Sequence, residues 1–217
     1  MSKSKIIYLF FAITSMFLIV LISSCNVRIN KSIHIPDGKS VRHSLNTING
    51  SIYIGSECMV RGNCRSVNGK IQVGRGSEIS DLDAVNGSIN LDKEVVVHGS
   101  VKSINGSIRC DRGCNVYYDI YTINGDIDIY NTTVEDDIKT INGDISILDN
   151  STVENNIIIK RKTGTSNYHH KITIKISEGS VVKGDILVHH DERKVRVILS
   201  EGGRVLGNIR NAEIIKE

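Results

Sequence analysis

The sequence predicts an all-β protein folded as a single-stranded β-helix (β-solenoid) of about nine coils. Two observations carry this prediction. A five-residue string, Ile/Val-Asn-Gly-x-Ile, occurs six times, and apolar residues stand at fixed offsets from each of its asparagines. The composition agrees, because 19 Gly against a single Pro, with no Trp and many Ile and Val, favours short strands joined by tight turns.

The repeat has a period of 18 or 19 residues. Its asparagines are Asn49, Asn68, Asn86, Asn105, Asn124 and Asn142. A copy of this length is too short to bury its own hydrophobic face, so the copies are expected to stack as coils. We expect each Asn-Gly pair to form a corner, since both residues tolerate positive φ, and the six asparagines to form a ladder of side-chain amides along the stack.

Apolar residues fall into columns when the copies are superposed. The third residue after the asparagine is always Ile: Ile52, Ile71, Ile89, Ile108, Ile127 and Ile145. The residue before the asparagine is always Ile or Val: Ile48, Val67, Val85, Ile104, Ile123 and Ile141. Positions three and five after the asparagine are apolar with a mostly polar residue between them, a period of two that indicates strand. Hairpins with type I′ Asn-Gly turns are the alternative, but the uniform period favours a solenoid.

The first 24 residues have the anatomy of an export signal: a short cationic start, an apolar run over residues 6–22, and two serines before Cys25. The segment from Leu21 to Cys25 resembles the lipobox of bacterial lipoproteins. The resemblance implies a lipoprotein signal peptide over 1–24, cleavage before Cys25, and attachment of fatty acids such as palmitate to that cysteine. The alternative is an uncleaved membrane anchor, for which the apolar run is at the short limit.

This reading predicts an exported protein held at the cell membrane or the outer membrane by its N-terminal lipid, since two acyl chains give durable attachment. In a Gram-negative host, Asn26 after the lipidated position resembles the pattern of lipoproteins that are forwarded to the outer membrane. Residues 25–44, which include Pro36, are predicted to be the lipidated N-terminus, a tether and a cap. Residues 45–217 are predicted to be the solenoid.

Four further cysteines, Cys58, Cys64, Cys110 and Cys114, are possible disulfide partners in an oxidising compartment. Pairing of 58 with 64 and of 110 with 114 is favoured over bridges across three coils, because the Cα atoms of a disulfide lie within about 7 Å of each other. The alternative is four small buried thiols.

Several function classes are disfavoured by the residues. The balance of 27 Lys and Arg against 24 Asp and Glu gives no footprint for nucleic acid. Sequence motifs for nucleophilic, phosphate-binding or metal-dependent catalysis do not occur, so we expect no enzyme activity and no cofactor. The His169-His170 and His189-His190 pairs, and Asp126 and Asp144, are expected to be solvated surface groups, and no metal site is predicted.

The repeated Asn-Gly corners and later blocks such as EGSVVKGDI (178–186) resemble two groups of bacterial β-solenoids over about residues 45–211. One group is the bactofilins, which are cytoskeletal polymers; the other comprises exported envelope proteins described as adhesin-like. The resemblance implies a non-enzymatic, lipid-anchored cell-envelope protein with a structural, scaffolding or adhesive role, whose partners are the membrane and either itself or another envelope protein. A bactofilin-like self-polymerising filament is the first alternative. A β-helix that binds or cleaves carbohydrate is the second.

Overall fold

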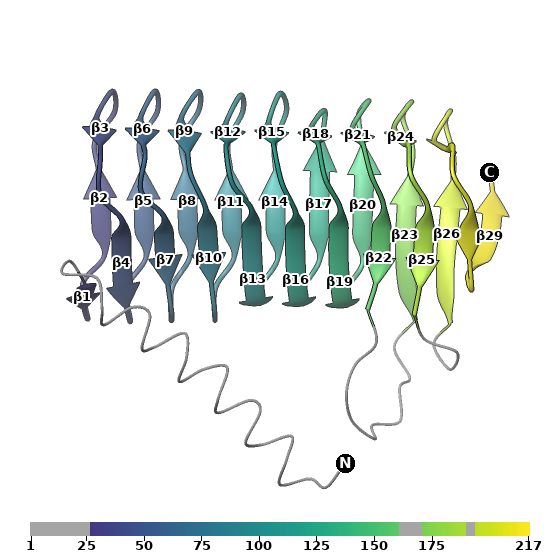
Figure 1. Ribbon diagram of the computed structural model, residues 1–217, viewed down its shortest axis with the longest axis horizontal. Helices are drawn as coiled ribbons and strands as arrows, with labels where there is room; N and C mark the ends of the chain where they lie inside the picture. Colours follow the sequence, from purple (N-terminus) through teal and green to yellow (C-terminus); the bar gives the residue numbers. More distant parts are fainter. Residues whose placement is uncertain (1–26, 161–170, 190–193) are drawn as a thin grey trace, which may run out of the picture.

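The structure, a computed structural model, describes residues 27–160, 171–189 and 194–217. Every helix or strand assigned in these residues is a β-strand, and the strands wind into a straight stack of coils, each coil advancing one step along the rod (Figure 1). Neighbouring coils pair in parallel throughout and form three sheets of ten, ten and nine strands. The predicted β-solenoid is therefore confirmed, with nine complete coils and a tenth that contributes two strands.

The three sheets run the length of the rod. Sheet 1 contains β1 (Val27–Ile29), β4 (Leu45–Ile48), β7 (Cys64–Ser66), β10 (Leu82–Ala84), β13 (Val101–Asn105), β16 (Ile120–Asn124), β19 (Ile138–Asn142), β22 (Ile157–Ile159), β25 (Ile186–Val188) and β28 (Ile209–Arg210). Sheet 2 contains β2 (Ile33–Ile35), β5 (Ile52–Ile54), β8 (Ile71–Val73), β11 (Ile89–Leu91), β14 (Ile108–Cys110), β17 (Ile127–Tyr130), β20 (Ile145–Leu148), β23 (Ile172–Ile176), β26 (Val195–Leu199) and β29 (Glu213–Lys216). Sheet 3 contains β3 (Ser40–Val41), β6 (Met59–Val60), β9 (Glu78–Ile79), β12 (Val96–Val97), β15 (Asn115–Val116), β18 (Thr133–Val134), β21 (Thr152–Val153), β24 (Val181–Val182) and β27 (Arg204–Val205).

The solenoid starts earlier than the sequence predicted. Residues 27–44, expected as part of a tether and cap, form a complete first coil in which β1, β2 and β3 pair with β4, β5 and β6. Ile33 of this coil is buried and belongs to the same column as Ile52. The string Ile29 to Ile33 reads Ile-Asn-Lys-Ser-Ile, a copy of the repeat with Lys31 in place of Gly, which concealed it.

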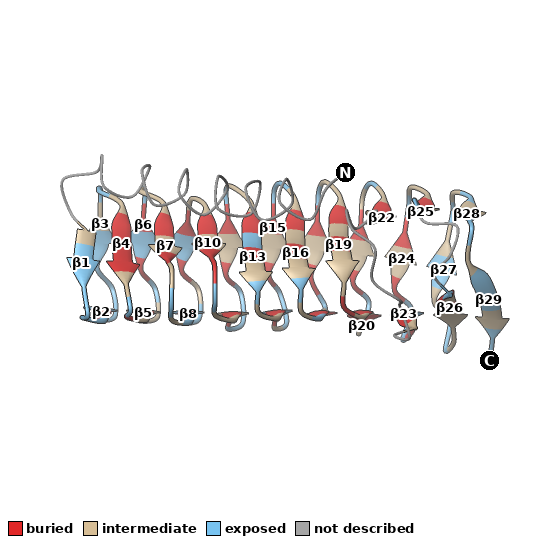
Figure 2. Cartoon of the chain, turned by 90° about the horizontal axis from the view of Figure 1, so that it is seen from below, coloured by how far each residue is buried: buried red, intermediate tan, exposed pale blue. Residues whose placement is uncertain are grey.

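Stacked apolar residues form a single packed core enclosed by the three sheets. Figure 2 shows buried residues along the strands and exposed ones at the corners and at the two ends. The predicted isoleucine column on sheet 2, which includes Ile108 and Ile127, is fully buried and in register from coil to coil. The column directly before the asparagines behaves differently, because Val85 alone among its six members is buried. It faces outward and forms a half-buried apolar ridge on sheet 1.

The inward column beside that ridge consists of small, mostly hydroxylated residues, two positions before each asparagine: Thr47, Ser66, Ala84, Ser103, Thr122 and Thr140, all buried. Several of their hydroxyls donate to a carbonyl of the preceding coil, as Ser66 does to Gly50 over 2.8 Å. A buried hydroxyl is tolerated where it makes such a bond. This column was not predicted, because Ser and Thr in a strand suggest an outward position.

Glycine is required at the corners for a reason other than the predicted one. Among the ladder asparagines in the described coils, positive φ occurs at Asn30 and Asn49 only. Instead, a Cβ at Gly106 would lie 2.3 Å from the carbonyl oxygen of Gly87, and the other corner glycines face the coil before them at similar distances. Close approach of successive backbones excludes a side chain here.

Candidate functional site

The asparagines of the repeat form a ladder along one edge of sheet 1. Each side-chain Nδ2 donates to the Oδ1 of the asparagine one coil earlier. The distances are 2.6–2.8 Å up to Asn124 and 3.5 Å for the last bond, from Asn142 to Asn124. Asn30 of the first coil accepts the bond from Asn49, so the ladder has seven members. All the amides are occupied with one another, which gives these residues a structural role.

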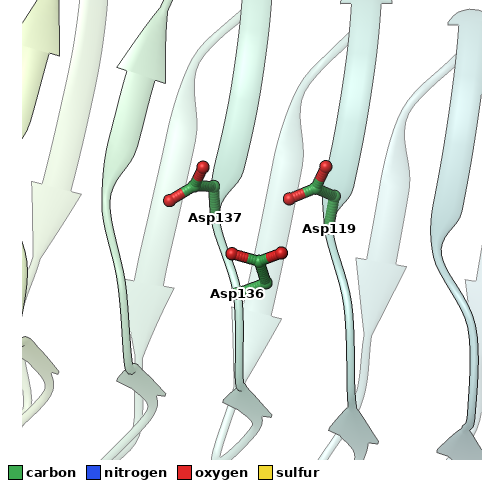
Figure 3. A group of neighbouring side chains, drawn as sticks. All are labelled: Asp119, Asp136 and Asp137. Carbon is green, nitrogen blue, oxygen red and sulfur yellow. The ribbon is translucent and has the colours of Figure 1, made fainter.

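Three carboxylates gather on the corner between sheets 3 and 1. Asp119 directly precedes β16, Asp136 and Asp137 precede β19, and oxygen atoms of the three lie within 4.8 Å of one another (Figure 3). Asp119 and Asp137 occupy equivalent positions in successive coils, and both side chains are mostly buried. Three oxygen ligands at this spacing are what a hard divalent cation would contact.

A lysine already pairs with two of these three carboxylates. Nζ of Lys139 lies 2.8 Å from both carboxylate oxygens of Asp119 and 2.9 Å from Oδ2 of Asp137. Burial raises the pKa of Asp137, but hydrogen bonds from Lys139 and Asn156 outweigh it and leave that pKa below its usual value. Burial likewise lowers the pKa of Lys139, and the bonds to the two aspartates outweigh it and raise that pKa. The cluster is an ion-pair network that holds two coils together.

The four predicted cysteine partners are free, buried thiols, so the locally paired disulfides are not formed in this structure. Cys58 and Cys114 share a column with Ser77 and Thr132, whose side chains donate to carbonyls of the preceding coil. The two thiols make the same contact, with Pro36 and Asp92 respectively, each over 3.1 Å. They replace a serine-like hydroxyl, whereas Cys64 and Cys110 fill apolar positions on sheets 1 and 2.

Burial opposes the ionisation of three of these thiols. It raises the pKa of Cys64 to about 12, and the pKa of Cys110 well above its ordinary value. The pKa of Cys114 rises to about 11, again through burial. Because the thiolate is the nucleophile and metal ligand, thiols that resist ionisation are suited to packing.

The remaining candidate residues in the described part of the chain have structural or surface positions. Asp126 accepts the backbone N–H of Asp144 over 2.9 Å, and Asp144 accepts that of Thr173 over 2.8 Å, so both carboxylates tie successive coils. His189 is exposed. Cys25, His169, His170 and His190 lie outside the described residues.

Three hollows lie at the two ends of the rod. One is lined by residues of the first coil and the start of the second, including Val27, Ile33 and Leu45, and two others by residues 194–217 with Lys171. From β1 to β22, at most four residues join each strand to the next. The described residues contain no helix long and apolar enough to span a membrane.

A family model described as Toastrack DUF4097 matches residues 14–195, which is most of the chain. The chain belongs to the Toastrack DUF4097 family. No curated protein and no solved structure matches it. Membership of the Toastrack DUF4097 family agrees with the repeated parallel coils and fits a structural or adhesive repeat protein.

Sequence reasoning missed the acidic cluster and Asn30. The cluster has a signal in the sequence, because the position before each sheet 1 strand holds Asp or Asn in most coils, as at Asp81, Asp119, Asp137, Asn156 and Asp185. Asn30 could have been recognised as a member of the ladder from its spacing of 19 residues from Asn49.

Proposed function

We propose that this member of the Toastrack DUF4097 family is a non-enzymatic, lipid-anchored protein of the bacterial cell envelope, whose rod has a scaffolding or adhesive role. The observation that carries the proposal is the form of the rod. Nine full coils, joined by short corners from β1 to β22, present long flanks, and the hollows described above lie at the ends. Such a surface suits contact with other macromolecules better than enclosure of a small substrate.

Attachment through Cys25 is supported by the position and charge of the first coil. The coil begins at Val27, two residues after the cysteine in the lipobox-like segment. Within residues 27–44, four basic residues, Arg28, Lys31, Lys39 and Arg42, stand against one acidic residue, Asp37. Positive charge beside a lipid anchor favours the anionic headgroups of a bilayer by about 1 kcal/mol per residue near the surface.

The test of the anchor is labelling of cells that express the full chain with a clickable palmitate analogue, followed by carbonate washing of membranes. We expect label on the protein and retention in the membrane fraction, with both lost in Cys25→Ala. Cys58→Ser is the matched control, because Cys58 occupies a serine-like position, and it should keep the label. Label that persists in Cys25→Ala, or an unlabelled protein that retains residues 1–24, would contradict the proposal.

The scaffolding or adhesive role has a separate readout. Envelope preparations containing the wild-type rod are treated with a short-range cross-linker and compared with preparations containing Cys25→Ala. Adducts of defined mass that require the anchor support the role. A rod that forms no adducts while fully lipidated would argue against it.

A further inference from the structure

The first coil differs from the six coils that follow it at two backbone positions, Lys31 and Pro36. At the first, Lys31 stands where the following six coils have Gly50, Gly69, Gly87, Gly106, Gly125 and Gly143. A Cβ on any of these glycines would lie 2.0–2.4 Å from a carbonyl oxygen of the coil before it. Lys31 carries such a Cβ, so its side chain occupies the space that the carbonyl of an earlier, in-register coil would need.

Pro36 removes a hydrogen bond that the other coils use to attach to their predecessor. At the equivalent position, the N–H of Gly55 donates to Ile35, that of Gly74 to Ile54 and that of Asp92 to Val73, over 2.8–3.0 Å. Proline has no N–H to donate, and its ring fills the place of the hydrogen. It is the only proline in the chain, and proline is characteristic of sheet edges that must remain unpaired.

We propose that the first coil is a built-in stop: its outer edge does not accept another coil in register, whether from this chain or from a second copy. Lys31 blocks the corner of sheet 1, and Pro36 blocks the end of sheet 2, so the two obstacles act on different sheets of the same end. A head-to-tail filament needs this edge to continue all three sheets. One closed end therefore prevents open-ended growth, even though Leu206 and Ile214 are 64% and 48% exposed near the opposite end.

This inference does not depend on the lipid anchor, since Lys31 and Pro36 act through backbone geometry. It separates the scaffold proposal from the bactofilin-like alternative. Two rods that meet by other surfaces form a closed dimer, and such a dimer is compatible with the stop because it does not grow.

The test is sedimentation velocity and negative-stain electron microscopy of the full chain in detergent over a wide concentration range. Wild type is compared with Lys31→Gly/Pro36→Gly, in which the corner and the missing N–H are restored. Lys39→Gly/Arg42→Ala is the matched control: it loses more charge from the same coil and keeps both obstacles. Far-ultraviolet dichroism establishes that each variant is folded.

We expect wild type and the control to remain single rods or closed dimers at every concentration. The restored variant should form end-to-end species whose weight-average mass at least doubles across the range. Filaments of wild type would overturn the proposal. So would a folded restored variant that associates no more than wild type, since Lys31 and Pro36 would then not be what closes the end.

Discussion

The side-chain Nδ2 of Asn105 donates a hydrogen bond to the side-chain oxygen of Asn86 over 2.8 Å, and Asn105 accepts the same bond from Asn124 over 2.8 Å. Each inner asparagine is thus both donor and acceptor, and the ladder links the first seven coils to one another. The bonds lie at an exposed edge, where each contributes modestly.

Replacing Asn105 with Ala should remove two rungs and lower the free energy of unfolding by about 1–2 kcal/mol. The measurement is the midpoint of denaturant unfolding. Asn90→Ala on the outer face of sheet 2 is the control and should change stability by less than about 0.5 kcal/mol. Equal effects at the two positions would mean that the ladder contributes nothing.

Gly106→Ala should lower the stability of the rod by more than the addition of one methyl group suggests. The new Cβ would lie 2.3 Å from the carbonyl oxygen of Gly87, so two coils must separate locally, and overpacking of this kind costs about 1–3 kcal/mol. Lys31→Ala, at the equivalent corner of the first coil, should be neutral because a Cβ is already accommodated there. Thermal unfolding of both variants measures the difference, and a neutral Gly106→Ala would refute the close-approach explanation.

The buried thiols predict a loss of stability at high pH. Folding raises the pKa of Cys64 to about 12 and of Cys114 to about 11, from an ordinary value of 9.0. The stabilisation that the two protonated thiols contribute is therefore complete below pH 9. It is lost as the pH rises toward their pKa values in the folded protein, because the thiols of the unfolded chain ionise first.

Unfolding free energy of Cys64→Val/Cys114→Ser should accordingly fall less than that of wild type between pH 9 and 11. Iodoacetamide at pH 8 should leave the four thiols of the native rod unmodified and label them after denaturation, as read by peptide mass spectrometry. Rapid alkylation of Cys64 in the folded protein would contradict its burial.

Lys139→Met should destabilise the rod by about 1–2 kcal/mol near neutral pH, because Asp119 and Asp137 lose their shared partner. The pKa of Asp137 is lowered in the folded wild type, so the stabilisation is present above the unfolded value and is lost as pH falls through the folded one. The gap between variant and wild type should therefore narrow toward acid pH.

Lys102→Met is the matched control, since Lys102 lies in the same column of sheet 1 two coils earlier and is exposed. It should be neutral. Millimolar Ca²⁺ should raise the melting temperature of Lys139→Met more than that of wild type, because the cation then meets three unneutralised carboxylates. A pH-independent difference between variant and wild type would contradict the ion-pair account.

The coil, its period and most of the core could be predicted from the sequence, because each repeat has its Asn-Gly pair and its apolar residues at the same offsets. The error at Ile104 and its equivalents has a simple cause. Val101 and Ser103 point inward and Ile104 points outward, since side chains alternate along a strand. Because it is apolar, the column that contains Ile104 was expected to be buried. The alternation of side chains instead places that column on the surface and the hydroxyls of Ser103 and Thr122 inside.

The other differences depend on neighbours in space. The first coil was not recognised because Lys31 stands where the next coils have Gly. Glycine is required at this corner only where the backbone of a preceding coil lies close to it. The acidic cluster brings together residues that are one coil apart in the sequence. It is an ion-pair network because Lys139 on β19 contacts Asp119 and Asp137. The thiols could pair or pack on sequence evidence alone; their column partners, Ser77 and Thr132, explain why they pack.

The most direct test of the stacked-coil account compares two internal deletions. Removing residues 87–124 joins Asn86 to Gly125, restores the Asn-Gly corner and removes two whole coils. Removing residues 87–114 removes a fractional number of coils. We predict that the first variant folds, unfolds cooperatively and is shorter by about 10 Å in small-angle scattering, whereas the second does not fold. Two variants that behave alike, both folded or both unfolded, would contradict the account.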